Sequence, residues 1–190
     1  MSERFTHNGL LITIEQDTDC SSNGPREWDN VGTMVCWHSR YGLGDEHPDC
    51  SPGDYLLALM QEREYKLHRY CVPDEIAPKH LQAYINKHYV VLPLYLYDHS
   101  GLSMSTSAFG CPWDSGQVGF IYVERTNTDY SDPVAGLTAE VEIYDQWLRG
   151  DVYCYTVEDS EGDIIDSCCG LYGYDYCRQE ALSVSAKCCA

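Results

Sequence analysis

The chain has 190 residues, of which 44% are hydrophobic, a proportion typical of a folded globular protein and unlike that of a disordered one. Its 30 acidic and 12 basic residues give a formal net charge of −18. Because proteins bind nucleic-acid phosphates with lysine and arginine, this charge excludes direct nucleic-acid binding over most of the surface. No apolar run reaches the roughly 18 residues that a membrane-spanning helix needs. We therefore expect a single domain, residues 1–190, that does not associate with membranes.

The first half of the chain predicts two strands followed by two helices. Residues 10–15 alternate between apolar and polar side chains, and residues 32–37 form a second short apolar run, as strands do. Ser51, followed by a proline and, three residues after the serine, by an acid, indicates a helix start. A second helix is expected from Pro78, with apolar residues at helical spacing after it.

The second half predicts five more strands and two more helices. Residues 89–97 are a nearly continuous apolar run of strand length, in which Pro93 removes one ladder donor and indicates a bulge or an edge. Thr138 and Gly150 are of the types that begin and end a helix. The other predicted elements are strands at 102–106, 117–124, 152–158 and 163–168 and a helix at 176–186. This order predicts an α+β fold, with a largely antiparallel β-sheet and three to four helices packed on it.

Eleven cysteines, an odd number, follow an N-terminal segment that lacks the basic start and apolar core of a secretory signal. This combination predicts reduced thiols in a cytoplasm. The stretches 36–38 and 47–50 each pair a cysteine with a histidine, but neither has the usual spacing of zinc ligands. Adjacent residues such as Cys168 and Cys169 rarely reach one metal ion. We therefore expect no metal site and no cofactor, and most cysteines to be small buried apolar residues.

A Trp-Asp turn that leads into an apolar strand occurs twice, at Trp28-Asp29 and at Trp113-Asp114. An aspartate in such a turn accepts hydrogen bonds from backbone N–H groups that follow it. We expect both aspartates to fix their turns in this way and both tryptophans to close an end of the sheet.

The densest group of chemically active side chains lies in residues 97–119. Cys111 would be a nucleophile there if His99 acted as its base and Asp98 or Asp114 oriented the base. Because Cys111 precedes a proline and does not open a helix, its local sequence does not stabilise a thiolate. We favour a loop held by side-chain-to-backbone bonds. A small-molecule or nucleotide site and a cysteine-dependent enzyme remain the alternatives at this loop.

Three segments stand out as motifs in chain order: PREWDNVGTM at 25–34, CPWDSGQVG at 111–119 and EGDIIDSCCGLYG at 161–173. Together they resemble landmarks of a family of small acidic proteins carried by bacteriophages and other mobile elements. The resemblance spans nearly the whole chain, and the middle motif is the most specific. It implies a phage or mobile-element origin, with the host cytoplasm as the location, and it transfers no catalytic or binding residue.

The charge distribution provides the main functional hypothesis. The net charge is −7 over residues 1–80, −1 over 81–123 and −10 over 124–190. Acidic phage proteins of the anti-CRISPR and antirestriction type place carboxylates where nucleic-acid phosphates would lie. We therefore predict a non-enzymatic inhibitor of a host defence system that binds a host protein with a basic nucleic-acid-binding surface. The expected contact residues are Glu140, Glu142, Asp145, Glu158, Asp159, Glu161, Asp163 and Asp166.

Overall fold

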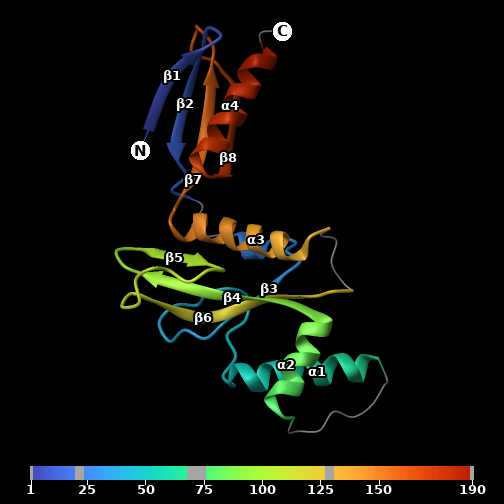
Figure 1. Cartoon of the computed structure of the whole chain (residues 1–190). Coiled ribbons are helices and arrows are strands. Elements are labelled where there is room, and N and C mark those ends of the chain that lie inside the picture. The colour runs from blue at the N-terminus through green and yellow to red at the C-terminus, as the bar shows by residue number, and fades with distance from the viewer. Residues whose placement is uncertain (1, 20–23, 68–75, 127–130, 189–190) are drawn as a thin grey trace. The chain divides into compact units, whose positions relative to one another are not determined.

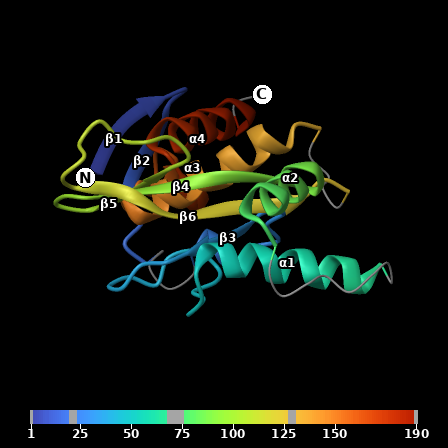
Figure 2. The ribbon, with the colours of Figure 1, turned by 60° about the horizontal axis from the view of Figure 1, so that its bottom comes forward.

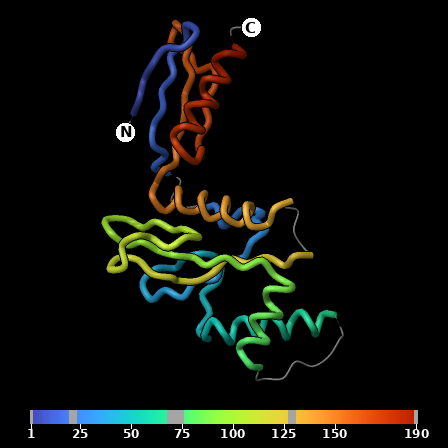
Figure 3. The backbone as a smooth tube through the Cα atoms, in the orientation of Figure 1, coloured from blue at the N-terminus to red at the C-terminus, as the bar shows by residue number. Residues whose placement is uncertain are grey.

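The computed structural model describes residues 2–19, 24–67, 76–126 and 131–188 (Figures 1 and 3). The described residues form four α-helices and two four-stranded antiparallel sheets. The predicted α+β class and the number of helices are therefore confirmed, although the strands divide between two sheets. The chain groups into two compact units, which are described separately: unit 1 comprises residues 1–27, 100–103 and 142–190, and unit 2 comprises 28–99 and 104–141. The single domain stays a prediction.

Unit 1 is a four-stranded sheet with a helix on one face (Figure 1). Its strands, in the order β1-β2-β7-β8, are Ser2–His7, Leu10–Gln16, Val152–Glu158 and Ile164–Tyr172, and its covering helix α4 is Tyr174–Cys188. Because side chains alternate along a strand, every second residue of β2 and β7 packs toward α4. The buried cluster so formed comprises Ile12, Ile14, Tyr155, Val157, Cys177 and Ala181.

Unit 2 is built on the sheet β3-β6-β4-β5, whose strands are Thr33–Cys36, Ser115–Glu124, Tyr89–Asp98 and Leu102–Ser105. Helices α1 (Pro52–Lys66) and α2 (Pro78–His88) pack on each other, and α2 leads directly into β4. Figure 2 shows β4 and β6 side by side, which are the two longest strands of this sheet. Helix α3 (Pro133–Leu148) belongs to unit 2 as far as Val141 and to unit 1 beyond it.

The predicted helix starts were right for α1 and α2 and wrong for α3. Ser51 caps α1, and its hydroxyl oxygen accepts a hydrogen bond from the Asp54 N–H. Helix α3 begins at Pro133, where the Asp132 carboxylate accepts hydrogen bonds from two backbone N–H groups. Thr138 lies inside the helix, where its hydroxyl donates a hydrogen bond to the Val134 carbonyl, one turn earlier. An aspartate followed by proline is therefore the signal that starts α3.

The irregularity expected at Pro93 lies one step further along β4. Pro93 pairs in register with Phe120, and the register shifts between Leu94 and Tyr95. Strand β1 was not predicted, because its exposed residues show little apolar alternation. Asn8 and Gly9 join β1 to β2 with φ angles of 52° and 79°. Asn-Gly is the preferred pair for such a hairpin turn, so the dipeptide was the signal for this strand.

The expectation that all the thiols are reduced is wrong for one pair, because Cys154 and Cys169 form a disulfide. Cys36 and Cys177 are buried, but most of the described cysteines are not, so the expectation of mostly buried cysteines is wrong for the described residues. Burial, with a smaller effect of Cys168, raises the pKa of Cys177 to about 11. The other free cysteines described are half-buried or exposed, namely Cys50, Cys111, Cys168 and Cys188. Cys20, Cys71 and Cys189 lie outside the described residues.

The Trp-Asp turns differ from the expectation. The tryptophans do not close the sheet, since Trp28 is 52% and Trp113 92% exposed. After the first turn, the backbone N–H groups of Val31 and Gly32 donate hydrogen bonds to the Glu140 carboxylate. Glu140 is thus the acceptor for these N–H groups, a role that was expected of Asp29. In the described residues, no helix is long and apolar enough to cross a membrane.

Candidate functional site

Residues 158–166, the acidic hairpin, connect β7 to β8 at one end of the unit 1 sheet. The Asp159 carboxylate accepts hydrogen bonds from the N–H groups of Glu161 and Asp163, at 2.8 and 3.0 Å. Gly162 has a φ of +87°, which a side-chain-bearing residue would adopt only with strain. Hydrogen bonds within the turn therefore stabilise it, and the Asp159 carboxylate is engaged in these bonds.

Glu140 does not belong to an acidic surface. Its side chain is 7% exposed, and one carboxylate oxygen accepts hydrogen bonds from the N–H groups of Val31 and Gly32, at 2.9 and 3.1 Å. A carboxylate that is almost fully buried and satisfies two backbone donors offers little surface to a partner protein. The geometry therefore supports a structural role for Glu140, and its assignment as a contact residue stays a prediction.

The other predicted contact residues do not form one patch. Glu142 and Asp145 lie on α3, before the start of β7, whereas the acidic hairpin follows its end. A seven-residue strand spans about 20 Å, which separates the two groups. Asp145 also pairs with Arg149 at 3.0 Å and accepts a hydrogen bond from the Ser103 hydroxyl.

Two carboxylates of the acidic hairpin remain available. Glu158 pairs with Arg4 at 3.7 Å, and the Asp166 carboxylate accepts a hydrogen bond from the Tyr155 hydroxyl. The side chains of Glu161 and Asp163 are exposed, and among the described residues neither has a partner. Two large apolar side chains follow them immediately: Ile164 is 65% and Ile165 41% exposed. The tip therefore presents free negative charge next to uncovered apolar surface.

The loop 97–119 brings together the three residues of the alternative catalytic hypothesis. One oxygen of the Asp114 carboxylate lies 3.4 Å from His99 Nδ1 and 3.5 Å from Cys111 Sγ. The carboxylate therefore stands between the thiol and the imidazole. A thiol nucleophile needs the base beside its sulfur, but here the thiol donates its hydrogen bond to the Asp114 carboxylate and not to the imidazole. The arrangement is that of a hydrogen-bonded loop rather than a catalytic triad.

A shallow cleft of about 380 Å³ opens beside this loop, lined among others by His38, Asp98, Trp113 and Asp114. His38 Nδ1 accepts hydrogen bonds from the N–H groups of residues 40 and 41. In the neutral ring the proton is then on Nε2, which becomes a donor. The cleft combines an exposed indole, one ring donor and two carboxylates.

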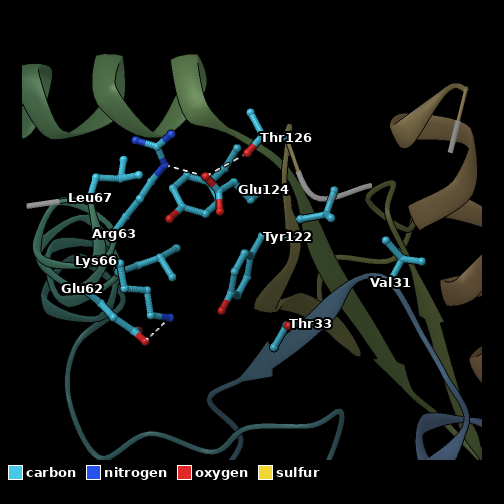
Figure 4. Close-up of a pocket in the computed structure, with 12 residues that line it drawn as sticks. Val31, Thr33, Glu62, Arg63, Lys66, Leu67, Tyr122, Glu124 and Thr126 are labelled. Atoms are coloured by element: carbon cyan, nitrogen blue, oxygen red, sulfur yellow. Dashed lines mark hydrogen bonds and ion pairs between the residues drawn. The ribbon is translucent and has the colours of Figure 1, made fainter. Parts of the chain in front are cut away.

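A larger cavity of about 610 Å³ lies between α1 and the sheet of unit 2 (Figure 4). Arg63 donates to Glu124 at 2.6 Å, and Lys66 pairs with Glu62 at 2.7 Å. Its volume suits a small ligand, but both of these cations already have a carboxylate partner. The cavity therefore offers a ligand no unpaired cation among its described lining residues, and we base no function on it.

A buried polar network adjoins this cavity. Glu64 is 1% exposed, accepts a hydrogen bond from the Tyr84 hydroxyl and pairs with Arg63 at 3.3 Å. Burial, then the hydrogen bond to Glu64, raises the pKa of Tyr84 to about 12, which keeps this hydroxyl a donor. The network links α1 to α2 and, through Arg63, to β6. It was not predicted, because Glu64 looks like a surface residue in the sequence.

Within the described part of the chain, one group of side chains could hold a metal ion: Asp17, Cys154 and Cys169 of unit 1. The pairs that the sequence suggested, in the stretches 36–38 and 47–50, are not part of such a group. No sequence motif indicates this group, because its members come from three separate strands or strand ends.

No family model, curated protein or solved structure matches the chain. The resemblance to acidic phage proteins therefore stays a prediction.

Proposed function

We propose that the protein binds a basic, nucleic-acid-binding host protein through the acidic hairpin and thereby inhibits a host defence system in the host cytoplasm. The observation that carries this proposal is the hairpin tip, where the free carboxylates of Glu161 and Asp163 adjoin the exposed Ile164 and Ile165. Exposed apolar side chains of this size commonly mark interaction sites. Carboxylates around them would meet the lysines and arginines that normally contact phosphates.

Two further properties of unit 1 support the proposal. Its sequence contains 15 acidic and 5 basic residues, a net of −10 in 80 residues, which would steer a basic partner toward it. The turn is also held by the Asp159 side chain and by the hydrogen bond from the Asp159 N–H to the Asp163 carbonyl, at 3.0 Å. A preorganised tip loses less conformational entropy when it binds.

The proposal predicts that charge reversal at the tip weakens binding and that the same reversal elsewhere does not. We expect Glu161→Lys/Asp163→Lys to lower the association rate with the host partner by about tenfold or more at physiological salt. The partner would be obtained by affinity capture from host lysate, and the rate measured by surface plasmon resonance over a salt series. The wild-type rate should fall as salt rises, because salt screens the long-range attraction.

The matched control is Asp29→Lys/Asp49→Lys. Both aspartates are exposed residues of unit 2, and the variant changes the net charge by the same amount. Equal rates for the two double variants would show that total charge, and not the hairpin, governs association. A captured partner without a basic surface would contradict the proposal as well.

A second candidate function is small-molecule binding in the cleft beside residues 97–119. It is favoured by Trp113, whose side chain is 92% exposed on the wall of that cleft. An exposed indole stacks on planar ligands and attracts cations. The carboxylates of Asp98 and Asp114 would repel phosphate, so the chemistry fits a neutral or cationic planar ligand better than a nucleotide.

For this candidate, we expect a small molecule to remain bound to the protein purified from its host and to be absent from Trp113→Ala, as read by native mass spectrometry. Because Trp113 is almost fully exposed, its removal should change the free energy of unfolding by no more than about 0.5 kcal/mol. A ligand that Trp113→Ala still retains would place binding elsewhere.

A further inference from the structure

The register of β7 against β8 places two cysteines opposite each other, next to a bulge. Tyr153 pairs with Leu171 and Tyr155 with Cys168, so that Cys154 faces two residues, Cys169 and Gly170. Gly170 has a φ of +73°, the left-handed conformation that such a bulge uses. The extra residue reverses the alternation of side chains in β8 beyond this point. The register of the pairs Val157–Asp166, Thr156–Ser167 and Tyr155–Cys168 continues to Cys154 and Cys169, which form the disulfide.

Asp17 is the third residue of the candidate metal-binding group and lies next to β7 on the side of β2, opposite β8. It follows the last residue of β2, and its N–H donates to the Val152 carbonyl. Its carboxylate accepts hydrogen bonds from the N–H groups of Gly170, at 3.1 Å, and Asp19, at 3.0 Å. The carboxylate oxygen and both sulfurs lie within 4.8 Å of one another. The two N–H donors orient the carboxylate, as donors around metal ligands commonly do.

These three residues share one face of the sheet. In β7 the neighbours of Cys154, Tyr153 and Tyr155, pack with the cluster under α4, so Cys154 points to the opposite face. Asp17 and Cys154 are half-buried, and Cys169 is exposed, which leaves the group accessible to an ion. Unit 1 is also the more acidic part of the chain per residue, which favours cations near it.

We propose that Asp17, Cys154 and Cys169 form a binding site for a thiophilic divalent cation such as Zn²⁺, and that the site becomes available when the Cys154–Cys169 disulfide is reduced. Thiolates select such ions, and two sulfurs with one carboxylate oxygen leave a fourth tetrahedral position for water. Ligand atoms around a tetrahedral zinc ion lie about 3.5 Å apart. The separations in this group are close enough for side-chain rotations to reach that geometry.

The redox and proton balance is simple. A dithiol reductant gives two electrons and two protons to the disulfide, whose S–S bond breaks to leave two thiols, while the reductant itself becomes a disulfide. The divalent cation then displaces the two thiol protons, which pass to solvent, and bonds to both sulfurs. A disulfide oxidant would reverse the process: it accepts the two electrons of the thiolates, takes up two protons from solvent to become two thiols, and leaves the Cys154–Cys169 S–S bond re-formed and the ion released.

The test uses the full chain reduced with a phosphine, which cleaves the disulfide without supplying competing thiols. Titration with Co²⁺ is followed through its absorption bands, which report thiolate ligation and tetrahedral geometry, and Zn²⁺ is then added to displace it. We expect one equivalent of Co²⁺ at this site in the reduced protein and none in the oxidised protein. Cys154→Ser/Cys169→Ser should lose that equivalent together with its thiolate bands.

Asp17→Asn keeps both thiols and separates this site from nonspecific thiol binding. We expect it to weaken Co²⁺ binding by at least about tenfold, since losing even an outer partner of a ligand typically costs 10–100-fold. Cys50→Ser/Cys188→Ser removes two exposed free thiols outside the group and should leave this equivalent unchanged. Circular dichroism of each variant identifies any that fail to fold. The proposal is overturned if the reduced wild type binds no Co²⁺, or if Cys154→Ser/Cys169→Ser or Asp17→Asn binds it as the wild type does.

Discussion

Gly119→Ala is expected to lower the free energy of unfolding by about 3 kcal/mol, because β6 has no room for a side chain at this position. A Cβ atom at Gly119 would stand 2.0 Å from the carbonyl oxygen of Val35 and 3.0 Å from Cys36 Cα. Both atoms are backbone of β3, which pairs with β6 at this point. Backbone in a paired strand cannot move aside without breaking hydrogen bonds, so the substitution must push β3 away from β6.

Gly116→Ala is the matched control in the same strand. A Cβ atom there has no neighbour within 4 Å, and the residue is exposed. We expect no loss of stability, or a gain of a few tenths of a kcal/mol, because alanine restricts the unfolded chain. Urea unfolding followed by circular dichroism measures both variants. If Gly119→Ala were as stable as Gly116→Ala, the pairing of β3 with β6 at Gly119 would have to be revised.

The fold class and most of the elements could be predicted, because they depend on local signals. The cap at Ser51, the apolar run 89–97 and the strands 152–158 and 163–168 each lie within a short window of sequence, and all were confirmed, the last strand being longer than predicted. Strand β1 was missed by the prediction because its residues are mostly exposed and polar. The start of α3 failed because the hydroxyl of Thr138 bonds inside the helix instead of capping it.

The candidate sites could be predicted only in part, because they depend on which residues meet across the fold. Cys111, His99 and Asp114 are near one another in sequence, and the loop does bring them together, but not in the order that nucleophilic catalysis needs. The meeting of Cys154 and Cys169 depends on the register of β8 against β7, and one residue of register decides it. The sequence holds no local sign of that register.

Glu140→Ala is expected to lower the free energy of unfolding by about 2–4 kcal/mol, since it leaves one buried and one part-buried donor without an acceptor, at about 1–3 kcal/mol for each donor that is fully buried. The donors are the N–H groups of Val31 and Gly32, which lead into β3. Glu140→Gln keeps a carbonyl oxygen as a neutral acceptor. It should cost less, about 1 kcal/mol, because hydrogen bonds to a charged group are roughly twice as strong as neutral ones.

Glu142→Ala distinguishes this structural role from the contribution of a surface carboxylate on the same helix. Glu142 is exposed, two residues from Glu140, so its removal should change stability by no more than about 0.5 kcal/mol. Amide hydrogen exchange provides a local measurement: exchange at Val31 and Gly32 should accelerate in Glu140→Ala and not in Glu142→Ala. If Glu140→Ala kept full stability and slow exchange but bound the host partner more weakly, Glu140 would return to the contact surface. The geometry predicts the opposite, because a carboxylate that is 7% exposed and accepts two backbone hydrogen bonds offers little surface to a partner.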